Sequence, residues 1–313
     1  MPKELIMPHP SADLSCPRIL TREGGVELSR IVAGMWRMTE WDMTPEARVA
    51  FIEECLALGV TSFDHADIYG DYGVESLFGE ALRLQPSLRD RIELVSKCGI
   101  RLLSRKHPNH AIQHYDTDAA HIIASSEESL RKLHTDRLDL LLIHRPDPLM
   151  DFDEIAEAFT RLRQAGKVRH FGVSNFTRHQ FESLNRRIAL STNQVEFSPL
   201  YTAPMFDETF DGLQDLRIAP MVWSPLGGGR LFDPASERAA TLRQTIQEVA
   251  ERLGKPFGSV VFAWIMQLPS RPVPLTGTRR IAAIADAVAG ATFRLERNDW
   301  FRILRAARGH EVA

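Results

Sequence analysis

Eight short apolar segments, separated by longer segments of helical spacing, constrain the fold of this 313-residue chain more than any other feature. They are nearly continuous in apolar character, as is typical of parallel strands covered on both faces. They occupy residues 31–36, 61–67, 92–99, 139–146, 170–176, 193–200, 219–226 and 271–278. Eight strand-then-helix units predict an α/β protein with a (β/α)8 TIM barrel, a fold that usually takes about 250 residues.

The connections between these segments support one continuous barrel. Thr44 is placed to cap a helix that begins at Pro45, and Gly59 follows its last turn. No Gly/Ser-rich linker or charge block interrupts the alternation, so we predict a single domain over residues 1–313. The rival fold is a doubly wound sheet, but its G-x-G-x-x-G signature is missing after the first strand, which ends in Gly34-Met35-Trp36.

Residues 1–30 are expected to form an N-terminal extension and hairpin before the barrel. Within them, residues 19–29 are predicted to form two short strands about Gly24 and Gly25, placed to plug the barrel floor. The N-terminus lacks the basic-then-apolar order of a signal peptide, and no apolar run approaches the roughly 18 residues of a membrane span. We therefore expect a soluble, cytoplasmic protein.

Charge and cysteine content exclude several partner classes. There are 38 Lys and Arg against 41 Asp and Glu, a net charge of −3, so no overall basic field favours nucleic acid or an anionic membrane. Cys16, Cys55 and Cys98 form no C-x-x-C pair, which argues against a disulfide framework or structural zinc. The expected partner is a small molecule, and no feature bears on the oligomeric state.

Four polar side chains stand at the ends of predicted strands, where barrel enzymes place their active sites. The second strand leads into Asp64 with Tyr69 in the following turn, the third ends at Lys97 and the fourth at His144. Each alone has a structural alternative: a helix cap, a packed phenol, a solvated amine or a core histidine. All four together favour a shared site.

This combination predicts carbonyl reduction. A neighbouring ammonium lowers the pKa of a phenol, so Tyr69 beside Lys97 would be a tuned general acid. Asp64 would hold Lys97, and His144 would orient a carbonyl oxygen. None of these side chains supplies a hydride, so a nicotinamide coenzyme is implied.

The remaining strand ends offer a place for that coenzyme. Ser174, Asn175 and Gln194 carry donors and acceptors suited to a carboxamide, and the indole of Trp223 can stack on a nicotinamide ring. Glycines 227–229 would let the backbone approach a pyrophosphate.

Three arginines are candidate phosphate contacts. Arg230 follows the glycine run, and Arg279 and Arg280 follow Gly277 and Thr278 at the start of a predicted helix, where an N-terminus favours anions. The alternative to phosphate binding is that these basic side chains are simply exposed to solvent in loops.

Several dispersed motifs now make the chain resemble the aldo-keto reductases over nearly its whole length. They are FDHADIYG (63–70), LLIHRPDP (141–148), GVSNF (172–176), NQVEFSPL (193–200) and WSPLGGGRL (223–231). The resemblance implies a barrel that uses NADPH or, less often, NADH to reduce aldehydes or ketones, with Asp64, Tyr69, Lys97 and His144 as catalytic tetrad.

The resemblance also implies a set of coenzyme contacts. They are Met35, Trp36, Ser174, Asn175, Gln194, Trp223, Ser224, Pro225, Leu226, Gly228, Arg230, Gly277, Thr278, Arg279 and Asp286. Met35 and Trp36 would lie by the nicotinamide end. Arg279 falls where relatives place a phosphate-contacting residue, which favours NADPH. The chain departs from the family pattern near the adenine end. Many relatives have an Arg or Gln followed by a Glu-Asn pair in the last coenzyme-binding helix, and this chain has Ala283 followed by Asp286-Ala287.

Two other functions remain open at this point. One is a regulatory protein that binds the nucleotide and turns over slowly. The other is a metal-dependent barrel hydrolase. Such an enzyme would need an H-x-H motif at an early strand end, where this chain has His65-Ala66-Asp67. Residues 101–115, with three histidines, lengthen the loop after the third strand and are expected to border the substrate site. We expect no metal there, because no Cys or carboxylate cluster completes a ligand set.

Overall fold

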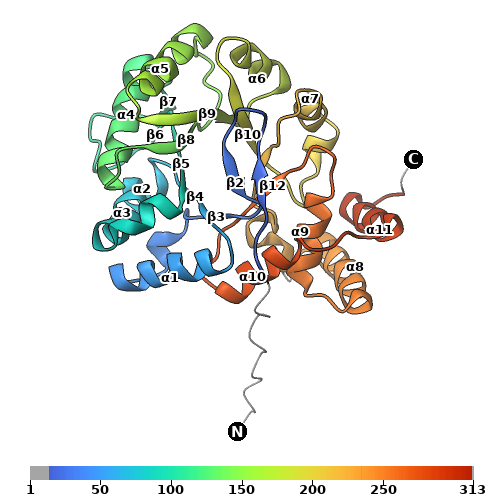
Figure 1. Ribbon diagram of the computed structural model, residues 1–313. Coiled ribbons are helices and arrows are strands. Elements are labelled where there is room, and N and C mark those ends of the chain that lie inside the picture. The colour runs from blue at the N-terminus through green and yellow to red at the C-terminus, as the bar shows by residue number, and fades with distance from the viewer. Residues whose placement is uncertain (1–13, 234, 312–313) are drawn as a thin grey trace.

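Eight parallel strands close into a barrel in the computed structural model, which describes residues 14–233 and 235–311 (Figure 1). The strands are β3 (Val32–Gly34), β4 (Ser62–Asp64), β5 (Glu93–Cys98), β8 (Leu138–Ile143), β9 (Val168–Ser174), β10 (Leu190–Glu196), β11 (Met221–Trp223) and β12 (Val273–Thr276). Each predicted apolar segment supplies one strand, and the ring closes where β12 pairs with β3. The predicted (β/α)8 barrel is confirmed.

Helices surround the ring of strands (Figure 1). They are α1 (Pro45–Ala57), α2 (Tyr69–Tyr72), α3 (Val74–Leu84), α4 (Ala119–Lys132), α5 (Phe152–Gln164), α6 (Arg178–Asn185), α7 (Thr209–Asp215), α8 (Glu237–Leu253), α9 (Phe257–Met266), α10 (Ile281–Ala289) and α11 (Arg297–Arg308). Thr44 caps α1 as predicted, because its side chain accepts a hydrogen bond from the backbone N–H of Ala47. Short 3₁₀ helices join some elements: η1 (Met38–Glu40), η2 (Pro86–Arg91), η3 (Ala203–Met205) and η4 (Gly227–Phe232).

The predicted N-terminal hairpin closes one end of the barrel. Its strands, β1 (Arg18–Leu20) and β2 (Glu27–Ser29), pair antiparallel, and it lies across the ring in Figure 1. Val26 and Leu28 are buried in the same cluster as Leu140 and Met221 of the barrel interior. The floor is therefore sealed by apolar side chains, and the opposite end is left for a site. Residues 1–13 of the predicted extension lie outside the described part of the chain.

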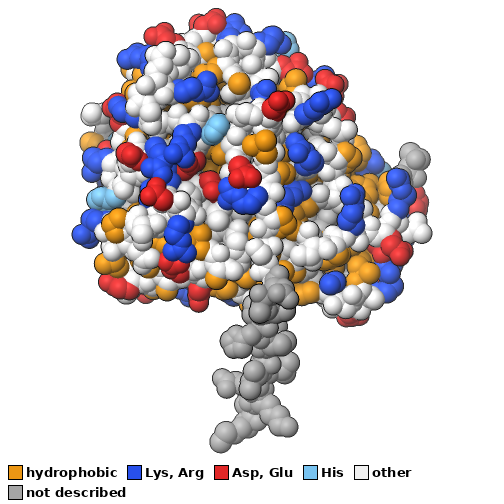
Figure 2. Space-filling model, viewed as in Figure 1, with side chains coloured by type: hydrophobic (Ala, Val, Ile, Leu, Met, Phe, Trp, Pro, Cys, Tyr) orange, Lys and Arg blue, Asp and Glu red, His pale blue; other side chains and the backbone are white. Residues whose placement is uncertain are grey.

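The floor face carries interspersed basic and acidic side chains (Figure 2). Within the residues that the structure describes, no helix has the length and apolar character to cross a membrane.

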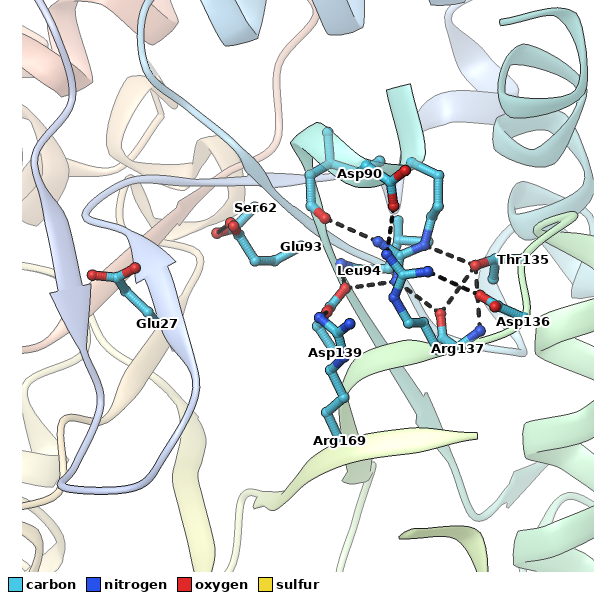
Figure 3. A network of polar contacts seen from close by, with 12 residues as sticks. Glu27, Ser62, Asp90, Glu93, Leu94, Thr135, Asp136, Arg137, Asp139 and Arg169 are labelled. Atoms are coloured by element: carbon cyan, nitrogen blue, oxygen red, sulfur yellow. Dashed lines mark hydrogen bonds and ion pairs between the residues drawn. The ribbon is translucent and has the colours of Figure 1, made fainter. Parts of the chain in front are cut away.

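Ion pairs tie the strands together at the floor (Figure 3). The carboxylate of Asp139 in β8 accepts hydrogen bonds from Arg89 at 2.8 Å, from Arg169 at 3.0 Å and from the backbone N–H of Leu94 at 3.0 Å. Arg89 is only 8% exposed. A buried guanidinium without a counterion is strongly unfavourable, so Asp139 is the centre of this network.

We expect Asp139→Asn to lower the free energy of unfolding by about 3–5 kcal/mol, because it leaves the Arg89 charge buried and unpaired. Urea denaturation followed by circular dichroism measures the loss. Asp90→Asn is the matched control, since Asp90 pairs with Arg137 through a side chain that is 81% exposed and surface pairs contribute little. Equal effects of the two substitutions would show that burial of the network is unimportant.

Candidate active site

The side chains of Asp64, Tyr69 and Lys97 meet at the open end of the barrel. Asp64 is the last residue of β4, Lys97 lies near the end of β5, and Tyr69 begins α2. The Lys97 ammonium donates to Asp64 Oδ2 at 2.6 Å, to the Tyr69 hydroxyl at 3.1 Å and to the His65 carbonyl at 2.7 Å. Because Lys97 is 1% exposed, these three oxygens take the place of water around its charge.

Burial and charge act in opposite directions on these groups. Burial by itself lowers the pKa of Lys97, but the Asp64 carboxylate and Tyr69 outweigh it and the net shift is upward. Lys97 therefore stays charged. Burial raises the pKa of Tyr69, and the nearby Lys97 ammonium offsets this only in part. The expected net lowering of the Tyr69 pKa is thus wrong, because desolvation of the phenolate outweighs the attraction of one ammonium. The phenol keeps its proton at neutral pH.

His144 follows β8 and completes the group. Its ring stands edge-on to the Tyr69 ring, with centroids 5.8 Å apart. Burial lowers its pKa well below the usual value, and the Lys97 and Arg145 charges lower it further, so the imidazole is neutral. A neutral imidazole carries one N–H donor.

A cavity of about 1640 Å³ opens above these side chains at the carboxyl end of the strands. Most of the predicted site residues line it: Trp36, Asp64, Tyr69, His144, Ser174, Asn175, Gln194, Trp223, Ser224, Pro225, Leu226, Gly228, Arg230, Gly277, Thr278 and Asp286. Leu102 also lines it, so the segment 101–115 meets the cavity at this residue, and Ile100 just before the segment lines the cavity too.

Lys97, Met35 and Arg279 do not line the cavity. Lys97 lies behind Asp64 and Tyr69, in contact with both. Met35, the residue after the end of β3, is fully buried in the core, whereas Gly34 and Trp36 on either side of it line the cavity. The Arg279 guanidinium instead donates to the backbone carbonyl of Trp41.

A chain of hydrogen bonds fixes the proposed carboxamide and stacking residues. Trp223 Nε1 donates to Asn175 Oδ1 at 3.1 Å, and Asn175 Nδ2 donates to Ser174 Oγ at 2.7 Å. Gln194 Nε2 donates to Asp64 Oδ1 at 2.8 Å, so this amide also orients the carboxylate that holds Lys97. The Arg145 guanidinium lies 5.7 Å from the centre of the Trp223 ring.

The glycine run forms η4, which passes along the cavity. Gly228 and Gly229 have φ of 64° and 99°, a conformation that suits glycine, and a Cβ at Gly229 would meet no atom of the described residues within 4 Å. Arg230 is already paired with Glu196 at 2.6 Å. Its predicted role as a phosphate contact therefore requires that it leave or share this carboxylate.

Several lining residues were missed by the sequence reasoning. Arg145 directly follows His144, and Arg37 directly follows Trp36, so proximity to a motif was a usable signal for both. Arg280, which the sequence did indicate as a candidate phosphate contact, lines the cavity, whereas its neighbour Arg279 does not. Arg243 of α8 had no sequence signal, because its approach depends on how that helix packs.

Comparison with known proteins gives consistent matches. Residues 30–308 match the aldo/keto reductase family. The chain is 52% identical to oxidoreductase YdhF of Escherichia coli (strain K12), over 94% of this chain and 99% of that protein. It is 43% identical to a 6-dehydroglucose reductase of Agrobacterium fabrum, over 92% of this chain and 97% of that protein. The solved structure of the thermostable aldo-keto reductase Tm1743 has the same fold, with a TM-score of 0.77 at 22% identity over 93% of this chain and 99% of that one.

The matched region contains all eight barrel strands and every residue of the cavity described above. The chain therefore belongs to the aldo/keto reductase family, whose members are oxidoreductases that use NAD(P)H.

Proposed function

We propose that this enzyme reduces aldehydes or ketones to alcohols with NADPH, and that Tyr69 is the proton donor. The observation that carries the proposal is the placement of the Lys97 ammonium within hydrogen-bond distance of both Asp64 and Tyr69, at the foot of a large cavity. A charged lysine next to a protonated phenol is suited to stabilise the phenolate that remains once the phenol has given up its proton.

The cavity fits a dinucleotide coenzyme. At Gly229 and Gly277 a Cβ would meet nothing within 4 Å in the part of the chain that the structure describes, so the backbone there would let a pyrophosphate approach closely. Ser174 and Asn175 would hold the carboxamide, Trp223 would cover the ring, and Arg280 would meet the 2′-phosphate. When bound, the coenzyme supplies the hydride.

Each member of the tetrad then has one task in the reduction. His144, neutral and buried, donates a hydrogen bond that orients the substrate carbonyl. The Tyr69 hydroxyl gives its proton to the carbonyl oxygen as the carbonyl carbon accepts the hydride, and an alcohol and a phenolate result. Lys97 stabilises that phenolate, and Asp64, held by Gln194, keeps Lys97 in place. A solvent proton restores the phenol.

The substrates that we propose first are small hydroxylated aldehydes. Two relatives, from Agrobacterium fabrum and Novosphingobium aromaticivorans, are named 6-dehydroglucose reductases. The cavity presents the Trp36 indole, 57% exposed, as a flat surface, and the Arg145 guanidinium as a donor for hydroxyl oxygens. Loss of NADPH absorbance with 6-dehydroglucose, simple sugars and aromatic aldehydes tests this choice.

A regulatory protein with slow turnover is not favoured, because the relatives of highest identity described above carry names of oxidoreductases or reductases. Wild-type protein that binds NADPH and reduces no member of the aldehyde panel would reverse that preference.

Tyr69→Phe should lower kcat by about 10² or more, the usual scale for loss of a general acid, and leave NADPH affinity nearly intact. Steady-state kinetics with the best aldehyde of the panel and fluorescence titration of NADPH measure the two effects. A variant that turns over at near wild-type rate would remove Tyr69 from the proton-donor role.

Trp223→Ala should weaken coenzyme binding by about 0.5–1.5 kcal/mol if the indole stacks on the nicotinamide. Equilibrium binding followed by quenching of intrinsic fluorescence gives the dissociation constant. Trp223→Phe is the matched control, because it keeps an aromatic face and should retain most of the affinity. An unchanged dissociation constant in Trp223→Ala places the ring elsewhere.

Arg280→Ala should weaken NADPH binding by about 1.5–3 kcal/mol, the usual contribution of a charged hydrogen bond, and leave NADH binding unchanged. Arg279→Ala should keep the coenzyme preference, because its guanidinium is engaged with the Trp41 carbonyl. Asp286 faces the same end of the cavity, so the wild-type preference should be moderate.

Values of kcat/KM for both coenzymes decide between the two arginines. Equal use of NADPH and NADH by wild type, or an undiminished preference in Arg280→Ala, would show that the 2′-phosphate is not recognised at this position.

A further inference from the structure

We propose that Tyr72 is a positioning residue for Tyr69. Its hydroxyl and ring, together with the Asp71 carbonyl, fasten the segment after β5 onto a strained turn that begins at Tyr69. We call these contacts with Leu102, Lys106 and His107 the latch. The inference rests on the proposed role of Tyr69 as proton donor.

Three consecutive residues after Tyr69, which make up the rest of the short segment labelled α2, have left-handed backbone in place of regular helix. Gly70 has φ 55° and ψ 44°, Asp71 has φ 52° and ψ 55°, and Tyr72 has φ 62°. Glycine adopts this conformation freely, and Gly70 is also required sterically, because a Cβ there would lie 2.4 Å from Thr39 Cγ2. Asp71 and Tyr72 are strained, since a left-handed turn brings their Cβ atoms against the backbone. Such strain persists only where surrounding contacts hold it.

The segment after β5 supplies these contacts. The Tyr72 hydroxyl accepts a hydrogen bond from the backbone N–H of Leu102 at 2.8 Å. The Lys106 ammonium donates to the carbonyl oxygen of Asp71 at 2.5 Å. The Tyr72 ring packs on the ring of His107, with centroids 4.3 Å apart. Both strained residues are therefore held from outside the turn, by a segment that is 30 or more residues away in sequence.

The turn connects the latch directly to the proton donor. Tyr69 accepts the backbone N–H of Gly73 through its carbonyl at 3.0 Å, and Tyr72 donates its N–H to Ile68 at 3.2 Å, so the two ends of the turn are bonded to each other. The Tyr69 hydroxyl, by contrast, has Lys97 as its one hydrogen-bond partner within the described residues. If the turn relaxes toward right-handed backbone, the phenol moves relative to Lys97 and to the substrate oxygen.

The latch also borders the cavity. Leu102, which donates to Tyr72, lines the cavity together with Ile100, and Gly70 and Asp71 line it from the turn. One wall of the substrate region is thus continuous with the element that places the proton donor. Misplacement of a reacting group by about 1 Å can lower a rate 10²-fold, so even a small relaxation should be visible in kcat.

Tyr72→Phe tests the proposal with a minimal change, because it removes the hydroxyl acceptor and keeps the ring. We expect kcat to fall at least tenfold, while substrate KM and the NADPH dissociation constant stay within twofold of wild type. Amide hydrogen exchange of the free enzyme, read by mass spectrometry, should become faster in residues 69–73 and 100–107. Tyr201→Phe is the matched control: Tyr201 is 42% exposed and outside the cavity lining, so kinetics and exchange should not change.

Lys106→Met cuts the latch at its second point, from an exposed side chain, and should lower kcat in the same direction with less effect on melting temperature. It decides the question if Tyr72→Phe does not fold. If both variants fold, a kcat within twofold of wild type in both overturns the proposal, and if only Lys106→Met folds, the same result in that variant overturns it. So does a matching rise in the NADPH dissociation constant, which would indicate general disruption of the site.

Failure of the proposed function is a separate outcome. If wild type reduces no carbonyl in the panel, the proposed role of Tyr69 as proton donor is wrong. The hydrogen-exchange experiment still tests whether the latch holds the turn. Faster exchange of residues 69–73 in Tyr72→Phe then supports the latch, and unchanged exchange overturns it.

Discussion

A buried ammonium, that of Lys97, is the group on which the arrangement of the site depends. A lysine that is 1% exposed keeps its charge only if oxygen atoms replace the water it has lost. The oxygens come from Asp64, His65 and Tyr69, at the end of β4 and in the turn beyond it, so the charge fixes how that turn sits against β5. The same contacts place a phenol next to a cation. The residues that stabilise the buried charge of Lys97 are therefore the same residues that the proposed proton transfer uses.

The barrel makes this convergence possible because every strand runs in the same direction. Residues 64, 97, 144 and 194 are far apart in sequence, yet each lies near a strand's carboxyl end, and parallel closure brings those ends to one rim. The hairpin and the Asp139 network seal and tie the opposite rim. One end of the barrel thus carries apolar and ionic contacts that stabilise it, and the other can hold polar groups around a cavity.

Particular residues show where reasoning from sequence stopped. Arg279 and Arg280 are adjacent and both precede Ile281, the first residue of α10, so a pattern that locates the helix start does not select which guanidinium faces the cavity. Met35 follows the last residue of β3 and packs into the core, while Gly34 and Trp36 on either side of it line the cavity. Arg230 was predicted to be a charge partner for a pyrophosphate, but it is paired with Glu196 of β10, a contact that the local motif does not indicate. The direction of the Tyr69 pKa shift depends on how deeply the phenol is buried. A position at the mouth of a predicted barrel, beside a predicted cation, does not reveal that burial.

The sequence by itself determined the number of barrel strands, their parallel character, the N-terminal hairpin and the side chains that can carry charge or a proton at strand ends. These follow from local periodicity, turn residues and motif order, which are properties of neighbouring positions. The sequence did not indicate the short antiparallel pair of β6 (Ile100–Arg101) and β7 (His114–Tyr115). The tertiary structure decided which guanidinium faces the cavity, that Gln194 bonds to Asp64, that burial outweighs the ammonium at Tyr69, and that residues 102–107 hold the left-handed turn. Those facts depend on distances and solvent exclusion between segments far apart in the chain, and no local pattern encodes either quantity.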